Sequence, residues 1–92
     1  MTVRAGLVGA GAVATRHARV LSGFPDVELV AVHDAARPAA EALAATCGAA
    51  VAGSLDELLA AGLDAVWLCV SPFAHGEPEL AAVRAGLPFF VE

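Results

Sequence analysis

The sequence contains no lysine and no tyrosine, and both absences limit its chemistry. The positive charges are all arginine, and they are scattered along the chain: Arg4, Arg16, Arg19, Arg37 and Arg84. The formal net charge is −5, and no basic stripe exists that could follow a nucleic-acid backbone. We therefore expect no nucleic-acid partner. Any proton transfer by this chain has to use histidine, carboxylate, cysteine or hydroxyl groups.

Long apolar runs and cysteines are also scarce. No apolar run approaches the roughly 18 residues of a membrane helix, and no basic segment followed by an apolar stretch begins the chain. The two cysteines, Cys47 and Cys69, fit neither a CxxC pair nor a disulfide framework. Cys69 lies inside an apolar run, which favours a small buried thiol. We expect a cytoplasmic protein without a membrane partner.

What the sequence does contain is small and apolar. Of its 92 residues, 59% are hydrophobic and 16% are charged, and about a quarter are alanine. This composition excludes a disordered tail and predicts a core of small side chains. A chain of this length forms one compact domain, which we place over residues 1–92.

Short β-branched runs alternate with alanine-rich helical stretches along the whole chain. A capping box of Ser54 and Glu57 begins one of the helices, and Ser71–His75 is an expected loop. The expected strands are Val3–Val8, Val27–His33, Ala50–Ala52, Ala65–Val70 and Leu87–Val91. The expected helices are Ala12–Ser22, Pro38–Cys47, a helix from Ser54 to Gly62, and Glu77–Ala85.

This alternation requires parallel strands joined by right-handed helical crossovers. It predicts a Rossmann-type α/β fold, in which an open, doubly wound sheet has the strand order 3-2-1-4-5 and helices on both faces. The ligand crevice of such a sheet lies beyond the strand carboxyl ends, between strands 1 and 4.

A glycine-rich turn follows the first strand and opens the first helix, which is the context of a dinucleotide fingerprint. Gly9 permits the tight turn, and Gly11 lets the backbone approach a pyrophosphate. Ala14 stands at the third position, where a small side chain lets helix and strand pack closely. The anion is expected on free N–H groups at the helix start, around Ala12 and Val13.

Asp34 ends the second strand roughly 20 residues after Gly11, where a carboxylate accepts the ribose hydroxyls of adenosine. The alternative is that Asp34 is a solvated strand-end residue or a local turn former. A carboxylate here favours NAD over NADP, because it repels a 2′-phosphate. Arg37 keeps NADP open, since its guanidinium can stack on adenine or pair with such a phosphate, or it is a surface residue.

The second half of the chain resembles one family closely. The segments SPFAHGE, LAAVRAG and PFFVE, together with GAGAVATRHARVL and SLDELLAAGLDAVWLCVSP, are similar to the N-terminal NAD(P)-binding Rossmann domain of the Gfo/Idh/MocA oxidoreductases. The resemblance covers the whole chain. It implies hydride transfer between a sugar or polyol hydroxyl carbon and the nicotinamide. It places Ser71, Pro72, His75 and Glu92 toward the nicotinamide half of the cofactor.

The resemblance also implies parts that this sequence lacks. The family's Glu-Lys-Pro pattern begins at Glu92, and its lysine has the leading catalytic role. We expect a truncation before that lysine and the absence of the family's substrate and dimerisation domain. The chain alone should then bind the dinucleotide without turnover, and an exposed last strand with Phe89 and Phe90 should favour self-association.

Two alternatives to this function are a stand-alone nucleotide-binding or sensor module and a different Rossmann dehydrogenase. The resemblance also includes a His on the first helix, here His17. For three residues the alternative is a purely structural role. His17 packs against the edge of the sheet, His75 is a polar residue at a helix start, and Glu92 is a frayed terminal residue.

Overall fold

The computed structural model describes residues 1–92 and alternates strands with helices along the chain. The strands are β1 (Val3–Val8), β2 (Val27–His33), β3 (Ala50–Val51), β4 (Ala65–Leu68) and β5 (Phe89–Val91). The helices are α1 (Ala12–Ser22), α2 (Arg37–Cys47), α3 (Leu55–Leu59) and α4 (Glu77–Arg84), with a 3-10 turn at Pro72–Ala74.

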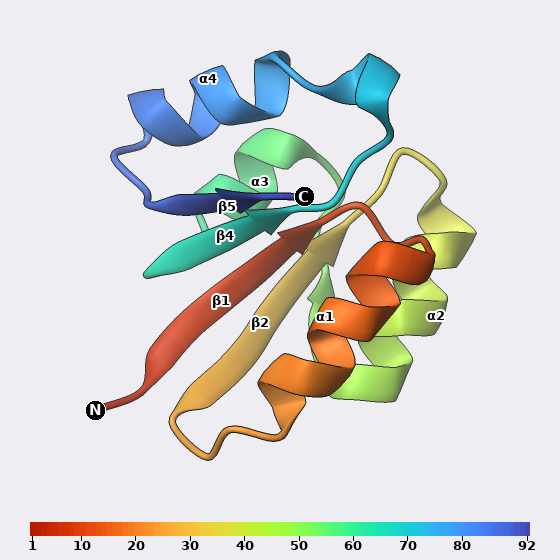
Figure 1. The fold of residues 1–92 in the computed structure, drawn as a ribbon, viewed down its shortest axis with the longest axis vertical. Coiled ribbons are helices and arrows are strands. Elements are labelled where there is room, and N and C mark those ends of the chain that lie inside the picture. The colour runs from red at the N-terminus through yellow and green to blue at the C-terminus, as the bar shows by residue number, and fades with distance from the viewer.

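All strands pair in parallel in one sheet of order β3-β2-β1-β4-β5. This confirms the predicted topology. The order reverses between β1 and β4, so the two halves of the chain diverge from this point (Figure 1). The carboxyl ends of the strands share one edge of the sheet, and the N-terminus lies at the opposite edge (Figure 1).

Helices cover both faces of the sheet, as predicted, and β1 supplies side chains to both cores. On one face, Leu7 packs with Ala14, Ala18 and Leu21 of α1 and with α2. On the other, Val8 packs with β4, α3 and α4. The buried positions of α1 are therefore those that its helical periodicity predicts.

Gly6 lets the α3 side of the sheet pack closely. A methyl group on Gly6 would lie 2.5 Å from Leu63 Cδ1 and 3.4 Å from Leu58 Cδ1. Its hydrogen therefore makes room for two leucines that belong to the second core.

Several expected element ends are wrong by a few residues. β4 ends at Leu68 rather than Val70, because its neighbour β1 leaves the sheet at Val8. β5 begins at Phe89 rather than Leu87, and β3 is only two residues long. α3 ends at Leu59 rather than reaching Gly62. Secondary-structure assignments move most easily at such ends, where single hydrogen bonds decide them.

The start of α3 follows the predicted capping box with one change. Ser54 Oγ accepts the Glu57 N–H at 3.0 Å, as expected. The Glu57 carboxylate, however, accepts the N–H of Gly53 at 2.6 Å rather than that of Ser54. Both contacts still hold the β3–α3 connection to the first turn of α3.

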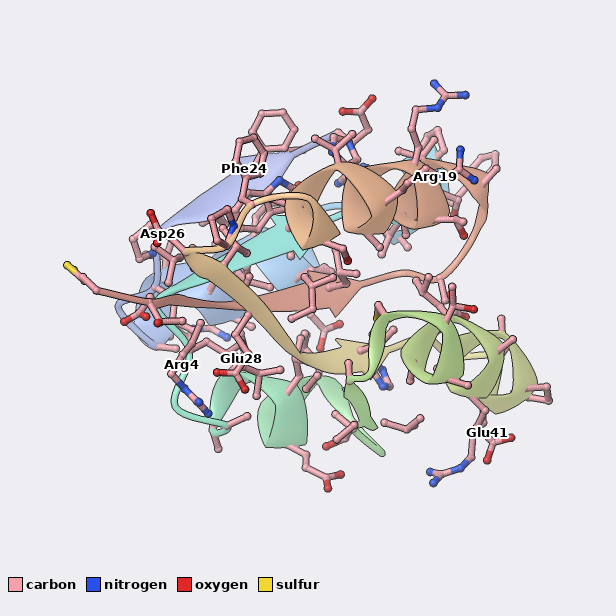
Figure 2. All side chains as sticks on the ribbon, turned by 90° about the horizontal axis from the view of Figure 1, so that it is seen from below. Arg4, Arg19, Phe24, Asp26, Glu28 and Glu41 are labelled. Atoms are coloured by element: carbon pink, nitrogen blue, oxygen red, sulfur yellow. The ribbon has the colours of Figure 1, made fainter.

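At the edge of the sheet where the strands begin, polar contacts link the start of β1 to β2 and to the loop before β4. Arg4 Nη1 lies 3.4 Å from Glu28 Oε1, and the two side chains meet in Figure 2. The Arg4 N–H donates to Asp64 Oδ2 at 2.8 Å. Arg4 and Glu28 stand at the starts of β1 and β2, whereas the glycine turn follows the end of β1, and neither residue lines a hollow at the carboxyl edge of the sheet.

Candidate functional site

Two adjoining hollows lie along the carboxyl edge of the sheet, with volumes of about 310 and 340 Å³. They share Gly11, Cys69, Val70 and Ser71, so we describe them together as the groove. Every predicted cofactor residue except Arg37 lines the groove: Gly9, Gly11, Ala12, Val13, Asp34, Ser71, Pro72, His75 and Glu92. The fold thus gathers residues from both halves of the chain.

Gly9 is required by the fold itself. It has φ of 96°, and its N–H donates to the His33 carbonyl at 2.7 Å. A Cβ at this position would overlap the Cys69 carbonyl oxygen. Gly9 therefore lets β1 turn tightly beside the end of β4.

Gly11 is different, because neither its backbone nor its neighbours require glycine. Its φ is −83°, which any residue adopts, and a Cβ here would meet no atom within 4 Å. The open space lies in the groove. A glycine that the fold does not require fits a ligand whose backbone approach needs that space.

The start of α1 offers donors to such a ligand. The helix has no side-chain cap at Gly11 and no acidic residue in its first turn. The first N–H groups of a helix have no intrahelical acceptor, and they attract anions together with the helix dipole. The residues present therefore fit a pyrophosphate at this position.

Asp34 is tied to the glycine turn through its side chain. Its Oδ2 accepts the Ala10 N–H at 2.7 Å, and its Oδ1 accepts the Ala36 N–H at 2.7 Å. The second contact is the local turn of the alternative interpretation, whereas the first spans 24 residues. Each carboxylate oxygen retains further acceptor capacity toward the groove. Asp34 thus holds the turn and can still accept ribose hydroxyls.

Arg37 stands apart from the groove. Its Nε lies 3.4 Å from Glu41 Oε2 in an exposed i,i+4 pair on α2, and 62% of its side chain is accessible. No contact holds its guanidinium toward Asp34. The structure places Arg37 as a surface residue outside the groove, and its role toward adenine or a phosphate stays a prediction.

His75 bounds the other half of the groove and is held by its own helix. Its Nδ1 lies 2.9 Å from Glu79 Oε2, and Glu79 Oε1 accepts the Gly76 N–H at 2.9 Å. The Gly76 N–H, more than any other contact, lowers the pKa of Glu79. The His75 ring is therefore fixed where the chain passes from Ser71 and Pro72 into α4.

Cys69 and His17 also belong to the site region, although the sequence predicted a buried thiol at Cys69 and packing against the sheet edge at His17. Cys69 lines both hollows of the groove. Burial, and after it the charge of Glu92, raises the pKa of the Cys69 thiol to about 11, so it stays protonated at neutral pH. His17 contacts Glu92 from α1, at 3.2 Å between Nε2 and Oε2. No spacing rule links residues so far apart in sequence.

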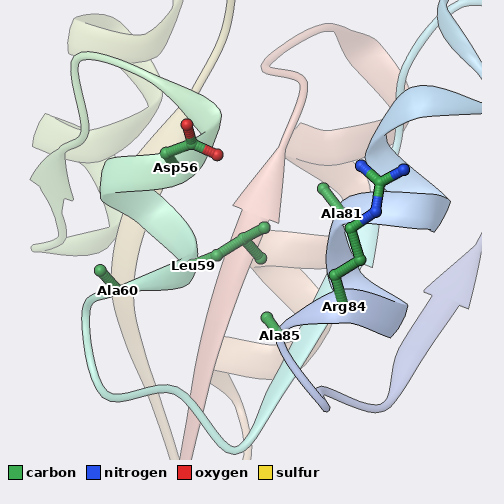
Figure 3. Close-up of a pocket in the computed structure, with 6 residues that line it drawn as sticks. All are labelled: Asp56, Leu59, Ala60, Ala81, Arg84 and Ala85. Atoms are coloured by element: carbon green, nitrogen blue, oxygen red, sulfur yellow. The ribbon is translucent and has the colours of Figure 1, made fainter.

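Another hollow, of about 340 Å³, lies between α3 and α4 and is shown in Figure 3. Asp56 and Arg84 border it, and leucine and alanine side chains form the remainder. It lies away from the carboxyl edge of the sheet, where parallel α/β folds bind ligands. No group of His, Cys, Asp and Glu side chains in the structure could hold a metal ion.

Residues 3–92 match the GFO_IDH_MocA family model, described as an oxidoreductase family with an NAD-binding Rossmann fold. The chain belongs to this family. The match confirms the resemblance, the fold and the NAD-binding character expected from the sequence. The Gfo/Idh/MocA domain also explains why the glycine turn, Asp34 and the end of β4 meet at one groove.

Individual relatives agree with this assignment. Inositol 2-dehydrogenase of Cereibacter sphaeroides is 46% identical over the whole chain, which spans 28% of that relative's length. Myo-inositol dehydrogenase from Lactobacillus casei, solved with NAD(H) and myo-inositol, is 30% identical with a TM-score of 0.92. That alignment covers 99% of this chain and 28% of the other.

A third relative binds the same cofactor. GenD2 from gentamicin A biosynthesis, solved in complex with NAD, is 30% identical with a TM-score of 0.94, over 98% of this chain and 26% of the other. The Gfo/Idh/MocA chain described here therefore spans little more than a quarter of the proteins it matches. None of its helices combines the length and hydrophobicity that crossing a bilayer requires.

Proposed function

We propose that this chain is the NAD-holding part of an oxidoreductase that acts on a hydroxyl carbon of inositol or a related sugar or polyol. The observation that carries the proposal is the single groove that joins the glycine turn and Asp34 to Ser71, His75 and Glu92. NAD, when bound, accepts or returns the hydride. The substrate class is supported by the inositol dehydrogenases to which the chain is similar.

The two halves of the groove suit the two halves of a dinucleotide. Asp34, at the end of β2, accepts the hydroxyls of the adenosine ribose, and the start of α1 holds the pyrophosphate. The β4–β5 side, with Ser71, His75 and Glu92, then receives the nicotinamide half. Asp34 makes the site favour NAD over NADP, because its negative charge repels a 2′-phosphate.

Catalysis needs more than this chain supplies. The chain has no lysine, and the groove residues are assigned to holding the cofactor. We expect the 92-residue chain to bind NAD and to show no turnover of sugars or polyols. Correct orientation of the reactants lowers the barrier of such reactions by roughly 7–11 kcal/mol. A positioned general acid or base raises the rate by about 10²–10⁴-fold. Both effects require groups in addition to the cofactor-holding residues of the groove.

Calorimetric titration with NADH and NADPH tests the binding, and absorbance in the NADH band tests turnover over a polyol panel. We expect NADH to bind more tightly than NADPH and no substrate-dependent reduction of NAD. Tighter binding of NADPH than of NADH would show that Arg37, through the 2′-phosphate, and not Asp34 decides the cofactor specificity. Sustained reduction by repurified chain would show that a base such as His75 acts within this chain.

A cytoplasmic location is part of the proposal. Both cysteines are unpaired thiols, as expected where the surroundings are reducing, and the cofactor is a diffusible intracellular dinucleotide. The stand-alone sensor module shares every binding residue with the proposal. If a longer natural form carries this chain, polyol oxidation by that form would contradict the sensor alternative.

A further inference from the structure

A contact between His17 and Glu92 joins α1 to the residue that follows β5. His17 lies in the second turn of α1, the helix whose start forms the pyrophosphate site, and Glu92 follows β5. His17 Nε2 lies 3.2 Å from Glu92 Oε2, although 75 residues separate them. We propose that His17 is a positioning residue that holds the Glu92 carboxylate in place for the nicotinamide half of the cofactor. This inference rests on the proposed function.

The direction of the contact follows from its chemistry. A carboxylate only accepts hydrogen bonds, so in the proposed contact the N–H at His17 Nε2 is the donor and Glu92 Oε2 is the acceptor. The second carboxylate oxygen, Oε1, makes no hydrogen bond within the chain and remains an acceptor for a ligand. A His17 ring held in one orientation therefore fixes Glu92 Oε2 and leaves Glu92 Oε1 to accept a hydrogen bond from the cofactor.

Aromatic packing holds the His17 ring in that orientation. The ring meets Phe90 edge to face, with centroids 5.6 Å apart, and Phe90 lies 6.3 Å from Trp67 of β4. Such pairs prefer edge-to-face or offset geometry, which restricts rotation of each ring. A quarter of the His17 side chain remains accessible, compared with 46% of Glu92. The histidine is thus the more buried partner of the two.

The backbone of Glu92 is anchored at the mouth of the groove. Its N–H donates to the Leu68 carbonyl at 3.1 Å, which extends the β4–β5 pairing by one bond. Glu92 lines the hollow that also contains Gly11, Val13 and Cys69. The influence of its charge on the Cys69 thiol agrees with a carboxylate that lies over the end of β4. With the Glu92 backbone anchored, the contact with His17 sets the rotamer of the Glu92 side chain.

The test compares NAD with ADP, which keeps the adenosine and the two phosphates but lacks the whole nicotinamide half, both its ribose and its ring. His17→Phe keeps ring packing against Phe90 and removes the donor, and His17→Gln places an amide N–H near the position of Nε2. Dissociation constants for both ligands are measured by calorimetry for the wild type, both variants, Glu92→Gln and the double variant His17→Phe/Glu92→Gln.

We expect His17→Phe to weaken NAD binding roughly tenfold, as for the loss of one charge-assisted hydrogen bond between Glu92 and the cofactor, and to leave ADP binding unchanged. His17→Gln should recover most of the NAD affinity, and His17→Phe should add nothing to Glu92→Gln. Equal weakening of both ligands, an unchanged NAD affinity, or a full additional loss in the double variant would each overturn the role. A wild-type chain that binds neither ligand would instead contradict the proposed function, and the positioning role with it.

Discussion

At the scale of single residues, Gly9 and Gly11 are two residues apart in the sequence but are glycine for different reasons. The fold requires Gly9, whereas Gly11 leaves open space in the groove. We expect Gly11→Val to preserve the fold and to lower NAD affinity by about 100-fold or more, because its side chain fills the open space at the pyrophosphate position. Circular dichroism and calorimetric titration measure the two effects separately.

Gly9→Ala is the matched comparison. It should destabilise the fold by about 2 kcal/mol or more, because φ is positive and the Cys69 carbonyl occupies the position of the new Cβ. Chemical denaturation reports this difference. If Gly11→Val retained NAD affinity with a native spectrum, the fingerprint interpretation of the turn would be wrong.

Asp34 combines a binding role with a structural one. Asp34→Ala removes the acceptor of the Ala10 and Ala36 N–H groups, so we expect a loss of about 1–3 kcal/mol in NAD binding and a lower free energy of unfolding. Asp34→Asn keeps one oxygen acceptor and should recover more stability than affinity. An unchanged NAD affinity in the alanine variant would leave Asp34 as a turn residue only.

The sequence predicted those parts of the site that depend on spacing along the chain. Gly9, Gly11 and Asp34 follow a pattern set by a strand, a turn and a helix of ordinary length. The Asp34 contact with Ala10 and the His17 contact with Glu92 could not be predicted, because each depends on how two distant segments approach one another. Arg37 shows the converse, since its position suggested a contact and its side chain lies in solvent.

At the scale of elements, the sequence located each helix and strand but not all of their ends. Helix ends with a clear local signal were correct: Gly48 adopts φ of 73° directly after α2, and Gly23 caps α1. The ends of β4 and β5 were misplaced because the neighbouring strand, rather than local composition, decides where pairing stops. Apolar residues such as Val70 continue past the last ladder bond and line the groove instead.

The start of α4 should respond to acid. The pKa of Glu79 lies below its usual value of 4.5 in the folded chain, chiefly through the Gly76 N–H. Its contribution to stability is therefore complete above that usual value and is lost as the pH falls through the lower folded value. We expect thermal unfolding from about pH 6 to 3 to show a smaller acid loss in Glu79→Gln than in the wild type.

Glu77→Gln is the control for this pH series, because Glu77 begins the same helix and its side chain makes no hydrogen bond within the chain. It should follow the wild-type acid profile. Identical profiles for the wild type and Glu79→Gln would show that the Gly76 contact does not persist in solution.

At the scale of the whole molecule, the strand order was predictable because parallel crossovers of one hand leave few ways to arrange five strands. The same arrangement leaves β5 at an edge. Phe89, Phe90 and Val91 are 37, 48 and 44% accessible, so this edge combines unpaired backbone groups with apolar side chains. We expect the average mass in sedimentation velocity to rise with protein concentration.

Phe89→Lys should abolish this association, since a charge on an edge strand opposes pairing with a second chain. Phe24→Lys is its control, because Phe24 is 54% accessible and lies beyond the end of α1, on the loop before β2 (Figure 2). A monomer at every concentration, or equal effects of both variants, would show that β5 does not mediate contact between chains.

The parallel sheet also determines which terminus of this molecule can carry a label, a tag or a linker. Met1 is fully accessible and lies at the amino edge, whereas Glu92 is part of the groove wall at the other edge (Figure 1). A fluorophore, affinity tag or surface linker attached at residue 1 therefore leaves cofactor access unobstructed. The same attachment after residue 92 would emerge at the mouth of the groove, beside His17, and would disturb the measurement that it was meant to report.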